Sequence, residues 1–279
     1  MEPPRTVILY HGNCPDGFGG AYAAWKKLGD SAEYIPLSRD IEPPTGFEGA
    51  HLYFVDFCYP KDIMDRYIAE AASVTVLDHH EGVEDVIISM PEYRYTSDHS
   101  GAVISWKYFH PESNVPMLLQ YVEQGDLYRS DLPDTESALA YLYTRPQTFF
   151  EWESLEAQME DPHERETIIE HGRVYAEYKS IIVAQIMAQA ELIEFEGYEC
   201  YLASCSKQFV SPVGNKLSLK LPPIALIASV HTWGVRVSLR SDGTTDVSAL
   251  ARKYGGNGHP YAAAFSLLWG TPIPWKSKS

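Results

Sequence analysis

The first half of the sequence alternates short apolar segments with longer helical patterns, and no other feature restricts the fold as strongly. Segments typical of buried strands lie at residues 7–10, 33–37, 52–55 and 74–77. Helical patterns lie at residues 20–28, 61–72, 102–109, 117–124 and 135–142. Strands separated by helices form βαβ units, in which helices cover both faces of a parallel sheet. The sequence therefore predicts an α/β fold, with a Rossmann-like domain at residues 1–150.

The second half changes its pattern twice. Residues 150–190 are almost wholly helical in character, and we expect a helical linker at residues 151–192. Strand-like segments return at residues 200–203, 224–230 and 235–239, with helical patterns at 211–219 and 247–254. These elements predict a second, smaller α/β domain at residues 193–279. Its last residues, from 269 onward, are expected to form an extended surface segment.

Charge is distributed unevenly over these parts. The chain carries 38 acidic and 22 basic side chains, for a formal net charge of −16. This balance disfavours long nucleic acid and anionic membranes as partners. Residues 206–279, however, contain nine basic and two acidic side chains. A basic domain on an acidic protein suggests a site for a small anion.

Cysteine usage and apolar patterning favour a cytoplasmic protein. The four cysteines form no Cys-x-x-Cys pair and are too few for a disulfide framework. The first residues lack the basic and apolar regions of a signal peptide. No apolar run approaches the 18 residues that a membrane-spanning helix needs. We therefore expect no membrane association, while the sequence leaves the oligomeric state open.

Polar side chains follow three of the predicted strands. His11 and Asp16 come after the first strand, Asp56 after the third, and Asp78, His79 and His80 after the fourth. The carboxyl ends of parallel strands meet at one edge of a sheet, where ligands bind in such folds. Carboxylate and imidazole are ligands for Mn²⁺, Fe or Zn²⁺. Any one of the aspartates could instead be a helix N-cap, but three such places together predict a metal site.

A glycine-rich segment in the basic domain suggests an anion site. Gly255, Gly256, Asn257, Gly258 and His259 follow the predicted helix at residues 247–254. Gly255 suits the left-handed cap of that helix, and Pro260 suits the first position of a further helix at residues 261–264. Free N–H groups of the loop and of that helix would cradle a phosphate. The alternative is a plain turn between two helices. The nearby Arg240 and Arg252 favour the phosphate site over this alternative.

Residues 95–102 lead from a loop into a helix. Ser100 or Asp98 could cap this helix, and His99 could instead reach a bound substrate.

With both motifs present, the sequence resembles the DHH phosphoesterases, in particular the nano-RNase or oligoribonuclease-like members. In this family a DHH domain precedes an associated C-terminal domain. The resemblance covers residues 6–130 and 195–268. Asp78, His79 and His80 match the triplet that gives the family its name. Residues 255–264 resemble the family's Gly-Gly-Gly-His-x-x-Ala-Ala-Gly motif.

The resemblance implies two metal ions, usually Mn²⁺, with Mg²⁺, Fe or Zn²⁺ as alternatives, in a cleft between the two domains. Asp56 would bridge the ions, and Asp16, His79 and Asp126 would complete one site. His11 would bind the other ion, and His80 would contact the substrate phosphate. Catalysis would thus rest on Asp56, His79 and His80. From the opposite domain, a phosphate would be held by Gly255, Gly256, Asn257, Gly258 and His259, with Arg240 and Arg252 nearby.

The sequence departs from the family pattern at three positions. Cys14 stands where the first motif has an aspartate. Cys14 either ligates as a thiolate, which would favour softer metals, or leaves the first metal weakly held or absent. Asn257 replaces a glycine but tolerates the left-handed conformation, and Ala264 replaces a glycine at the end of the second motif.

The expected activity is hydrolysis of phosphodiester or phosphomonoester bonds in small nucleotides by a metal-activated water. Short oligonucleotides cleaved from the 3′ end are the first expectation. A polyphosphatase or pyrophosphatase is the alternative enzyme, and a catalytically weak nucleotide sensor is the alternative outside enzymes. A dinucleotide-dependent oxidoreductase is disfavoured, because residues 7–28 lack the G-x-G-x-x-G pattern.

Overall fold

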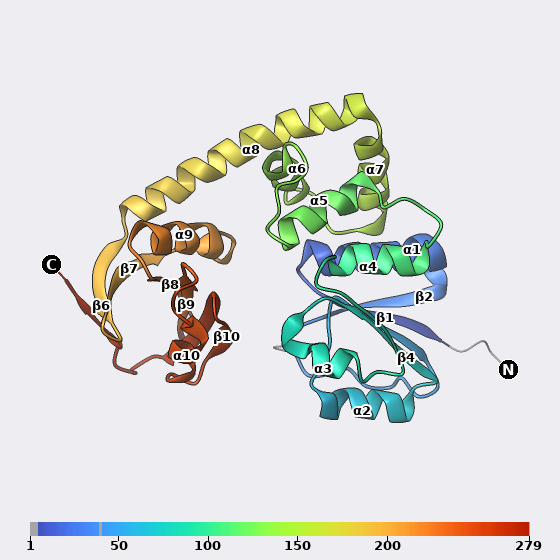
Figure 1. Cartoon of the computed structure of the whole chain (residues 1–279), viewed down its shortest axis with the longest axis horizontal. Helices are drawn as coiled ribbons and strands as arrows, with labels where there is room; N and C mark the ends of the chain where they lie inside the picture. Colours follow the sequence, from blue (N-terminus) through green and yellow to red (C-terminus); the bar gives the residue numbers. More distant parts are fainter. Residues whose placement is uncertain (1–4, 39–40, 279) are drawn as a thin grey trace. The chain divides into compact units, whose positions relative to one another are not determined.

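The computed structural model describes residues 5–38 and 41–278, and it divides into two compact units. The first unit comprises Met1–Ala176 and the second Glu177–Ser279. The long helix α8 (Pro162–Ala188) begins in the first unit and ends in the second (Figure 1). The expected cleft between the domains stays a prediction.

The first unit is built on a five-stranded sheet in which every strand is parallel to its neighbours. Its order is β2-β1-β3-β4-β5. The strands are β1 (Thr6–His11), β2 (Ala32–Leu37), β3 (His51–Val55), β4 (Ser73–Asp78) and β5 (Glu92–Tyr95). This confirms the predicted α/β fold. The short edge strand β5 was not predicted, because Glu-Tyr-Arg-Tyr lacks the apolar run of the other strands.

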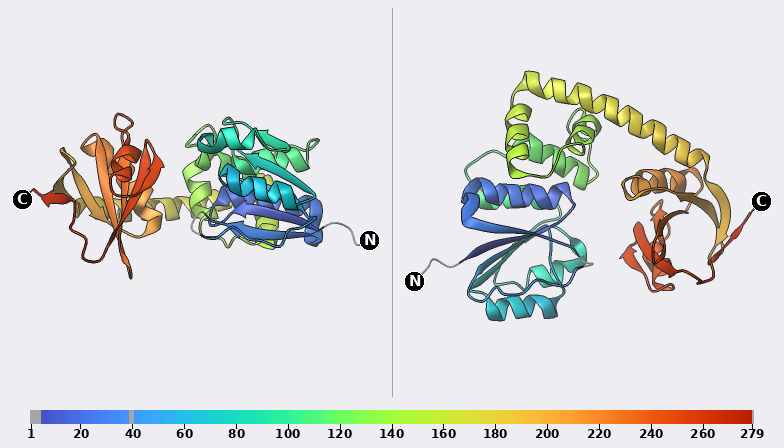
Figure 2. Two further views of the ribbon diagram at one scale, coloured as in Figure 1. Left: turned by 90° about the horizontal axis from the view of Figure 1, so that it is seen from below. Right: turned by 180° about the vertical axis from the view of Figure 1, so that it is seen from behind.

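Helices cover both faces of this sheet, as the views in Figures 1 and 2 show. One face carries α1 (Pro15–Leu28) and α4 (Gly101–Phe109), and the other carries α2 (Lys61–Glu70) and α3 (Glu84–Ile87). Side chains alternate between two apolar clusters: Ile8 packs with α1 and α4, whereas Val7 and Leu9 pack with α2. Burial on both faces explains why the central strands are continuously apolar.

Further helices extend the core of the first unit beyond the sheet. They are α5 (Met117–Asp126), α6 (Thr135–Leu142) and α7 (Phe149–Glu160). The fully buried Trp152 of α7 packs edge-on against Phe18 of α1, with ring centroids 4.9 Å apart. The helical pattern of residues 150–190 is therefore present as α7 and α8, and α7 is part of the core of the first unit.

The second unit contains a seven-stranded mixed sheet with the order β10-β11-β9-β8-β7-β6-β12. The strands are β6 (Glu191–Phe195), β7 (Tyr198–Ser204), β8 (Ile224–His231), β9 (Gly234–Ser241), β10 (Asn257–His259), β11 (Ala262–Leu268) and β12 (Trp275–Ser277). The helix α9 (Lys207–Lys220) connects the parallel pair β7 and β8 and packs on one face of the sheet. The helix α10 (Val247–Arg252) packs on the other face.

The predicted helix at residues 261–264 is wrong, since these residues belong to β11 and its approach. Ala263, Phe265 and Leu267 point into the core while Ser266 and Leu268 are exposed, which is the two-residue period of a strand. This burial outweighs the helix-start preference of Pro260. The glycine-rich segment therefore leads into a β-hairpin, and no helix N-terminus is available there to cradle an anion. Gly256 is needed because a Cβ would lie 2.2 Å from the carbonyl oxygen of Ala264.

Gly255 and the C-terminal segment have the conformations that the sequence predicted. Gly255 has a φ of +72° just after α10, as predicted for a left-handed cap. The C-terminal segment is extended and adds β12 to the edge of the sheet beside β6. Within the described ranges, no helix combines the length and apolar character needed to cross a membrane.

Candidate metal centre

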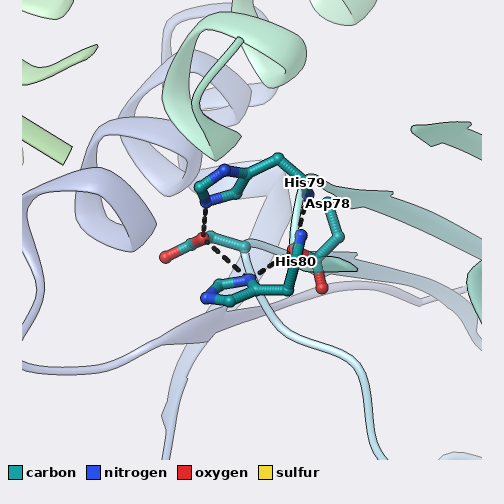
Figure 3. A group of neighbouring side chains, drawn as sticks. Asp78, His79 and His80 are labelled. Atoms are coloured by element: carbon teal, nitrogen blue, oxygen red, sulfur yellow. Dashed lines mark hydrogen bonds and ion pairs between the residues drawn. The ribbon is translucent and has the colours of Figure 1, made fainter. Parts of the chain in front are cut away.

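The predicted site residues of the first unit converge at the carboxyl edge of the parallel sheet. His11 ends β1, Asp56 follows β3, and the triplet from Asp78 to His80 lies at the end of β4. Figure 3 shows this triplet, and its dashed lines join the rings of His79 and His80 to the same neighbouring carboxylate. Helices α1 and α5 add Asp16 and Asp126. One edge of the sheet therefore collects side chains that are up to 115 residues apart in sequence.

Asp56 lies between histidines from two different strands. Its Oδ2 accepts a hydrogen bond from Nδ1 of His11 at 3.1 Å, and its Oδ1 lies 3.2 Å from Nε2 of His79. Burial alone would raise the pKa of Asp56, but these two histidines lower the pKa to about 2. The residue has a φ of +54°, in the left-handed region. The carboxylate of Asp56 is thus charged, and its two oxygens face different histidines.

His79 faces three carboxylates with one ring nitrogen. Its Nε2 lies 3.2 Å from Asp56, 3.3 Å from Asp126 and 3.6 Å from Asp16. Burial alone would lower the pKa of His79, but the three negative charges raise the pKa to about 9. In the metal-free protein the ring of His79 therefore carries a proton. The same three carboxylates would attract a metal cation.

Asp16 is held by the first turn of α4. Its Oδ2 accepts a hydrogen bond from the N–H of Gly101 at 2.7 Å, and its Oδ1 accepts one from Ala102 at 3.0 Å. A Cβ on Gly101 would lie 2.6 Å from the Cβ of Asp56, so only glycine permits this approach. Burial, and then the charges of Asp56 and Asp126, raise the pKa of Asp16 well above its usual value. A nearby cation would relieve this repulsion.

The structure shows which residue caps the start of α4. Of the two predicted candidates, Ser100 and Asp98, the N-cap of α4 is Ser100, whose Oγ accepts from the N–H of Val103 at 3.5 Å. The role of Gly101 was missed. A serine followed by glycine at the start of a helix gives no sign in the sequence that another element approaches closely.

Asp78 was also missed as an individual functional residue. It is fully buried, and its Oδ1 accepts from the backbone N–H of His79 at 2.7 Å and of His80 at 3.1 Å. The same oxygen accepts from Nδ1 of His80 at 2.7 Å. Asp78 therefore orients His80 through its ring as well as through the backbone, which leaves Nε2 of His80 for other partners.

Cys14 lies at the N-cap position of α1 without capping it. Its sulfur, a nitrogen of His11 and an oxygen of Asp56 lie within 4.8 Å of one another. Burial, and then the negative charge of Asp56, raise the pKa of the Cys14 thiol to about 12. The residue is therefore a neutral thiol in the metal-free protein, and becoming a thiolate ligand would require loss of its proton to a bound cation.

These residues fit divalent cations. The described residues contain one group formed by Asp16, His79 and Asp126 and another formed by His11, Cys14 and Asp56, each with donor atoms within 4.8 Å. A third group joins Asp56 and His79 with Asp78 and His80. Oδ1 of Asp56 and Nε2 of His79 are buried and form an ion pair at 3.2 Å without the geometry of a hydrogen bond. A cation coordinated by carboxylate and imidazole would satisfy both atoms.

The remaining predicted residues have partners of their own. His99 donates from Nδ1 to Glu123 at 3.1 Å and accepts at Nε2 from Lys107 at 2.6 Å. In the second unit, Arg240 donates to Ser211 at 2.9 Å, and Arg252 donates to Ser248 at 3.0 Å. The segment from Asn257 to His259 is exposed. The substrate contacts expected of these residues stay predictions.

Comparisons with known sequences give a relative but no function. No protein-family model matches the sequence. An uncharacterized protein of Acanthamoeba polyphaga mimivirus is 28% identical over an aligned length of 306, and the alignment covers 96% of this chain and 72% of the mimivirus protein.

Solved structures share the fold over nearly the whole chain. The DHH domain of a protein described within a family of ribosomal proteins has a TM-score of 0.63 at 11% identity, covering 95% of this chain and 83% of that one. An exopolyphosphatase-related protein from Bacteroides fragilis has a TM-score of 0.54 at 14% identity, covering 96% and 88%. The pGpG-specific phosphodiesterase PggH from Vibrio cholerae has a TM-score of 0.52 at 14% identity, covering 95% and 94%. The protein therefore has the fold of the DHH-domain proteins, which confirms the resemblance at the level of the fold.

Proposed function

We propose that this protein is a metal-dependent phosphoesterase that hydrolyses small phosphorylated substrates, with short oligonucleotides as the first candidates. One observation carries the proposal. Nε2 of His79 lies within 3.6 Å of the carboxylates of Asp16, Asp56 and Asp126, while Asp56 also binds His11. A carboxylate shared between two groups of ligands suits a pair of divalent ions held close together.

In this proposal Asp16, His79 and Asp126 hold one ion, His11 and Cys14 contribute to the other, and Asp56 serves both. When bound, two ions supply Lewis acidity toward phosphate oxygens and make water a stronger nucleophile at neutral pH. The protein's own part is to fix the ligands. Asp16 is fixed by two N–H groups of α4, and Asp56 is fixed between its two histidines.

His80 is the residue that we assign to the substrate phosphate. Burial alone would lower the pKa of His80, but the hydrogen bond to Asp78 and the charge of Asp56 outweigh it and raise the pKa. A ring that keeps its proton on Nδ1 toward Asp78 can carry a second proton on Nε2. This N–H can donate to a phosphate oxygen and offset its negative charge.

The second unit would supply the remaining anion contacts. Its basic residues include Arg240 and Arg252, and the exposed segment with Gly258 and His259 forms the β10–β11 hairpin. Because no helix begins at residue 261, contacts to phosphate would come from the hairpin backbone and from the His259 ring.

Two structural neighbours bear on the substrate. The name of the Vibrio cholerae protein specifies pGpG, a two-nucleotide substrate, and this supports a short oligonucleotide here. The Bacteroides fragilis protein is related to exopolyphosphatases, and this supports phosphoanhydride hydrolysis as the second candidate function.

A hydrolysis screen tests the proposal. The purified full chain is incubated with Mn²⁺, Mg²⁺ or Zn²⁺ and with dinucleotides, cyclic dinucleotides, 3′-phosphoadenosine 5′-phosphate, pyrophosphate or polyphosphate. Release of nucleoside monophosphate from dinucleotides is the expected result, and Asp56→Asn is the inactive control. Turnover of polyphosphate or pyrophosphate alone would replace the first function with the second. Tight nucleotide binding without any turnover would instead identify a sensor.

A further inference from the structure

A cavity of about 260 Å³ lies beside the candidate metal centre in the first unit. Asn13 and Pro15, the two neighbours of Cys14, line it together with residues from the segment between α6 and α7. That segment contributes Tyr143, Arg145 and Gln147. None of these side chains is among the proposed metal ligands. The cavity is therefore next to the metal centre but chemically separate from it.

Trp152 belongs to the lining but not to the ligand-accessible surface of the cavity. It is 0% exposed, and its buried Nε1 makes no hydrogen bond to any residue that the structure describes. Hydrogen bonds to a ligand would therefore come from the other polar side chains of the lining.

The charge of the cavity argues against a phosphate site. Arg145, its one cationic lining residue, donates from Nε to Glu151 at 2.6 Å, and its guanidinium lies 5.7 Å from the centre of the Tyr141 ring. The carboxylate of Glu151 therefore offsets its charge. The lining also presents two amide side chains, Asn13 and Gln147, and the side chain of Tyr143. These groups suit a planar ring that carries both donors and acceptors.

The size and position of the cavity further restrict the class of ligand that fits it. Cavities that take drug-sized molecules measure roughly 300–1,000 Å³, so this one suits a single ring system. Tyr143 is 63% exposed, so part of its side chain is accessible to a ligand. Desolvation of its hydroxyl raises the pKa of Tyr143, and the neighbouring Cys14 and Asp126 raise it further, in keeping with its place beside the metal centre.

We propose that this cavity binds one nucleobase of the substrate while the phosphate lies at the metal centre. Tyr143 would stack on the base, and the amide side chains of Asn13 and Gln147 would bond to its edge. The inference rests on the proposed function and makes it more specific, since a base-binding cavity selects nucleotides over pyrophosphate and polyphosphate.

Calorimetric binding to the metal-loaded full chain tests the cavity without any turnover. The probes are nucleoside monophosphates and ribose 5-phosphate, which has the phosphate but no base. Because base stacking on an aromatic side chain typically changes affinity about fivefold to a hundredfold, Tyr143→Ala should weaken nucleotide binding by this factor. It should leave ribose 5-phosphate binding unchanged. Tyr143→Phe should retain the wild-type affinity, and Gln147→Ala should lose part of it.

The control variant is Phe150→Ala, which removes a nearby aromatic ring that is 76% exposed and outside the cavity. It should bind nucleotides as the wild type does. Equal losses for nucleotide and ribose 5-phosphate in Tyr143→Ala, or no loss for either, would overturn the proposal. So would a wild type that binds both probes equally well.

A second measurement separates this inference from the proposed function. A dinucleotide and an abasic analogue are compared as substrates of wild type and Tyr143→Ala, and only kcat/KM for the dinucleotide should fall. If the wild type hydrolyses neither, the proposed function fails, while the binding experiment still decides whether the cavity takes a base. If hydrolysis is found and both substrates respond equally, the cavity assignment fails and the proposed function stands.

Discussion

Glu123 accepts a hydrogen bond from the backbone N–H of Ser100 at 2.9 Å, and this contact joins two helices of the metal centre. Its Oε2 also accepts from Nδ1 of His99 at 3.1 Å. Ser100 caps α4, whose first N–H groups hold Asp16. Glu123 lies one turn before Asp126 in α5. The contact therefore fixes the position of Asp126 relative to Asp16, which makes Glu123 a positioning residue.

Glu123→Ala should weaken metal binding without removing a ligand. Residues that orient metal ligands typically change affinity by about 10- to 100-fold, and we expect a loss in this range. Metal titration followed by calorimetry measures it. Glu166→Ala removes an exposed glutamate from α8 and is the charge-matched control. Equal affinities in the two variants would show that Glu123 does not position the site.

Asp56→Asn should abolish turnover and reduce the number of bound metal ions while the protein stays folded. The carboxylate pairs with both His11 and His79, and the neutral amide of asparagine cannot supply its negative charge to either metal ion. Metal content by elemental analysis, with circular dichroism for the fold, checks the expectation. An active Asp56→Asn protein would eliminate the shared-ligand assignment.

Cys14→Asp should keep or raise activity with Mn²⁺ and shift the metal preference from soft to hard ions. The wild-type thiol, whose pKa is raised to about 12, is a poor ligand for hard cations. A carboxylate at this position would bind them directly. Competition between Mn²⁺ and Zn²⁺ measures the shift. Loss of Mn²⁺ activity in the variant would mean that the sulfur itself is a required ligand or packs too tightly to replace.

Metal binding should release protons at neutral pH. His79 has a pKa raised to about 9, so below that pH its ring holds a proton that a cation must displace. Apparent affinity should therefore rise with pH and level off, for this residue, above about pH 9. Calorimetry in two buffers of different ionisation enthalpy counts the protons. A binding enthalpy that does not depend on the buffer would contradict the expectation.

The metal centre could be predicted because parallel strands bring their carboxyl ends to one edge. His11, Asp56 and His79 each follow an apolar run, and the βαβ order alone places them together. Asp126 could not be found by this route, because it ends a helix, and only the family resemblance pointed to it.

Other features depend on contacts between distant segments. Gly101 is required by the approach of Asp56, which is 45 residues away in sequence. The β11 strand was mistaken for a helix, because a proline followed by alanines resembles a helix start and the alternation becomes clear only at Phe265 and Leu267. The lining of the cavity combines Asn13 with Trp152, and no local pattern relates these residues.

The left-handed backbone at residue 56 limits how this protein could change over evolutionary time. At a φ of +54° most side chains add strain of roughly 1–2 kcal/mol, whereas aspartate, asparagine and glycine are tolerated best. A descendant that lost its metals could therefore keep its fold most readily through asparagine or glycine at this position. An inactive relative would then be distinguished by a single residue type in an otherwise unchanged scaffold.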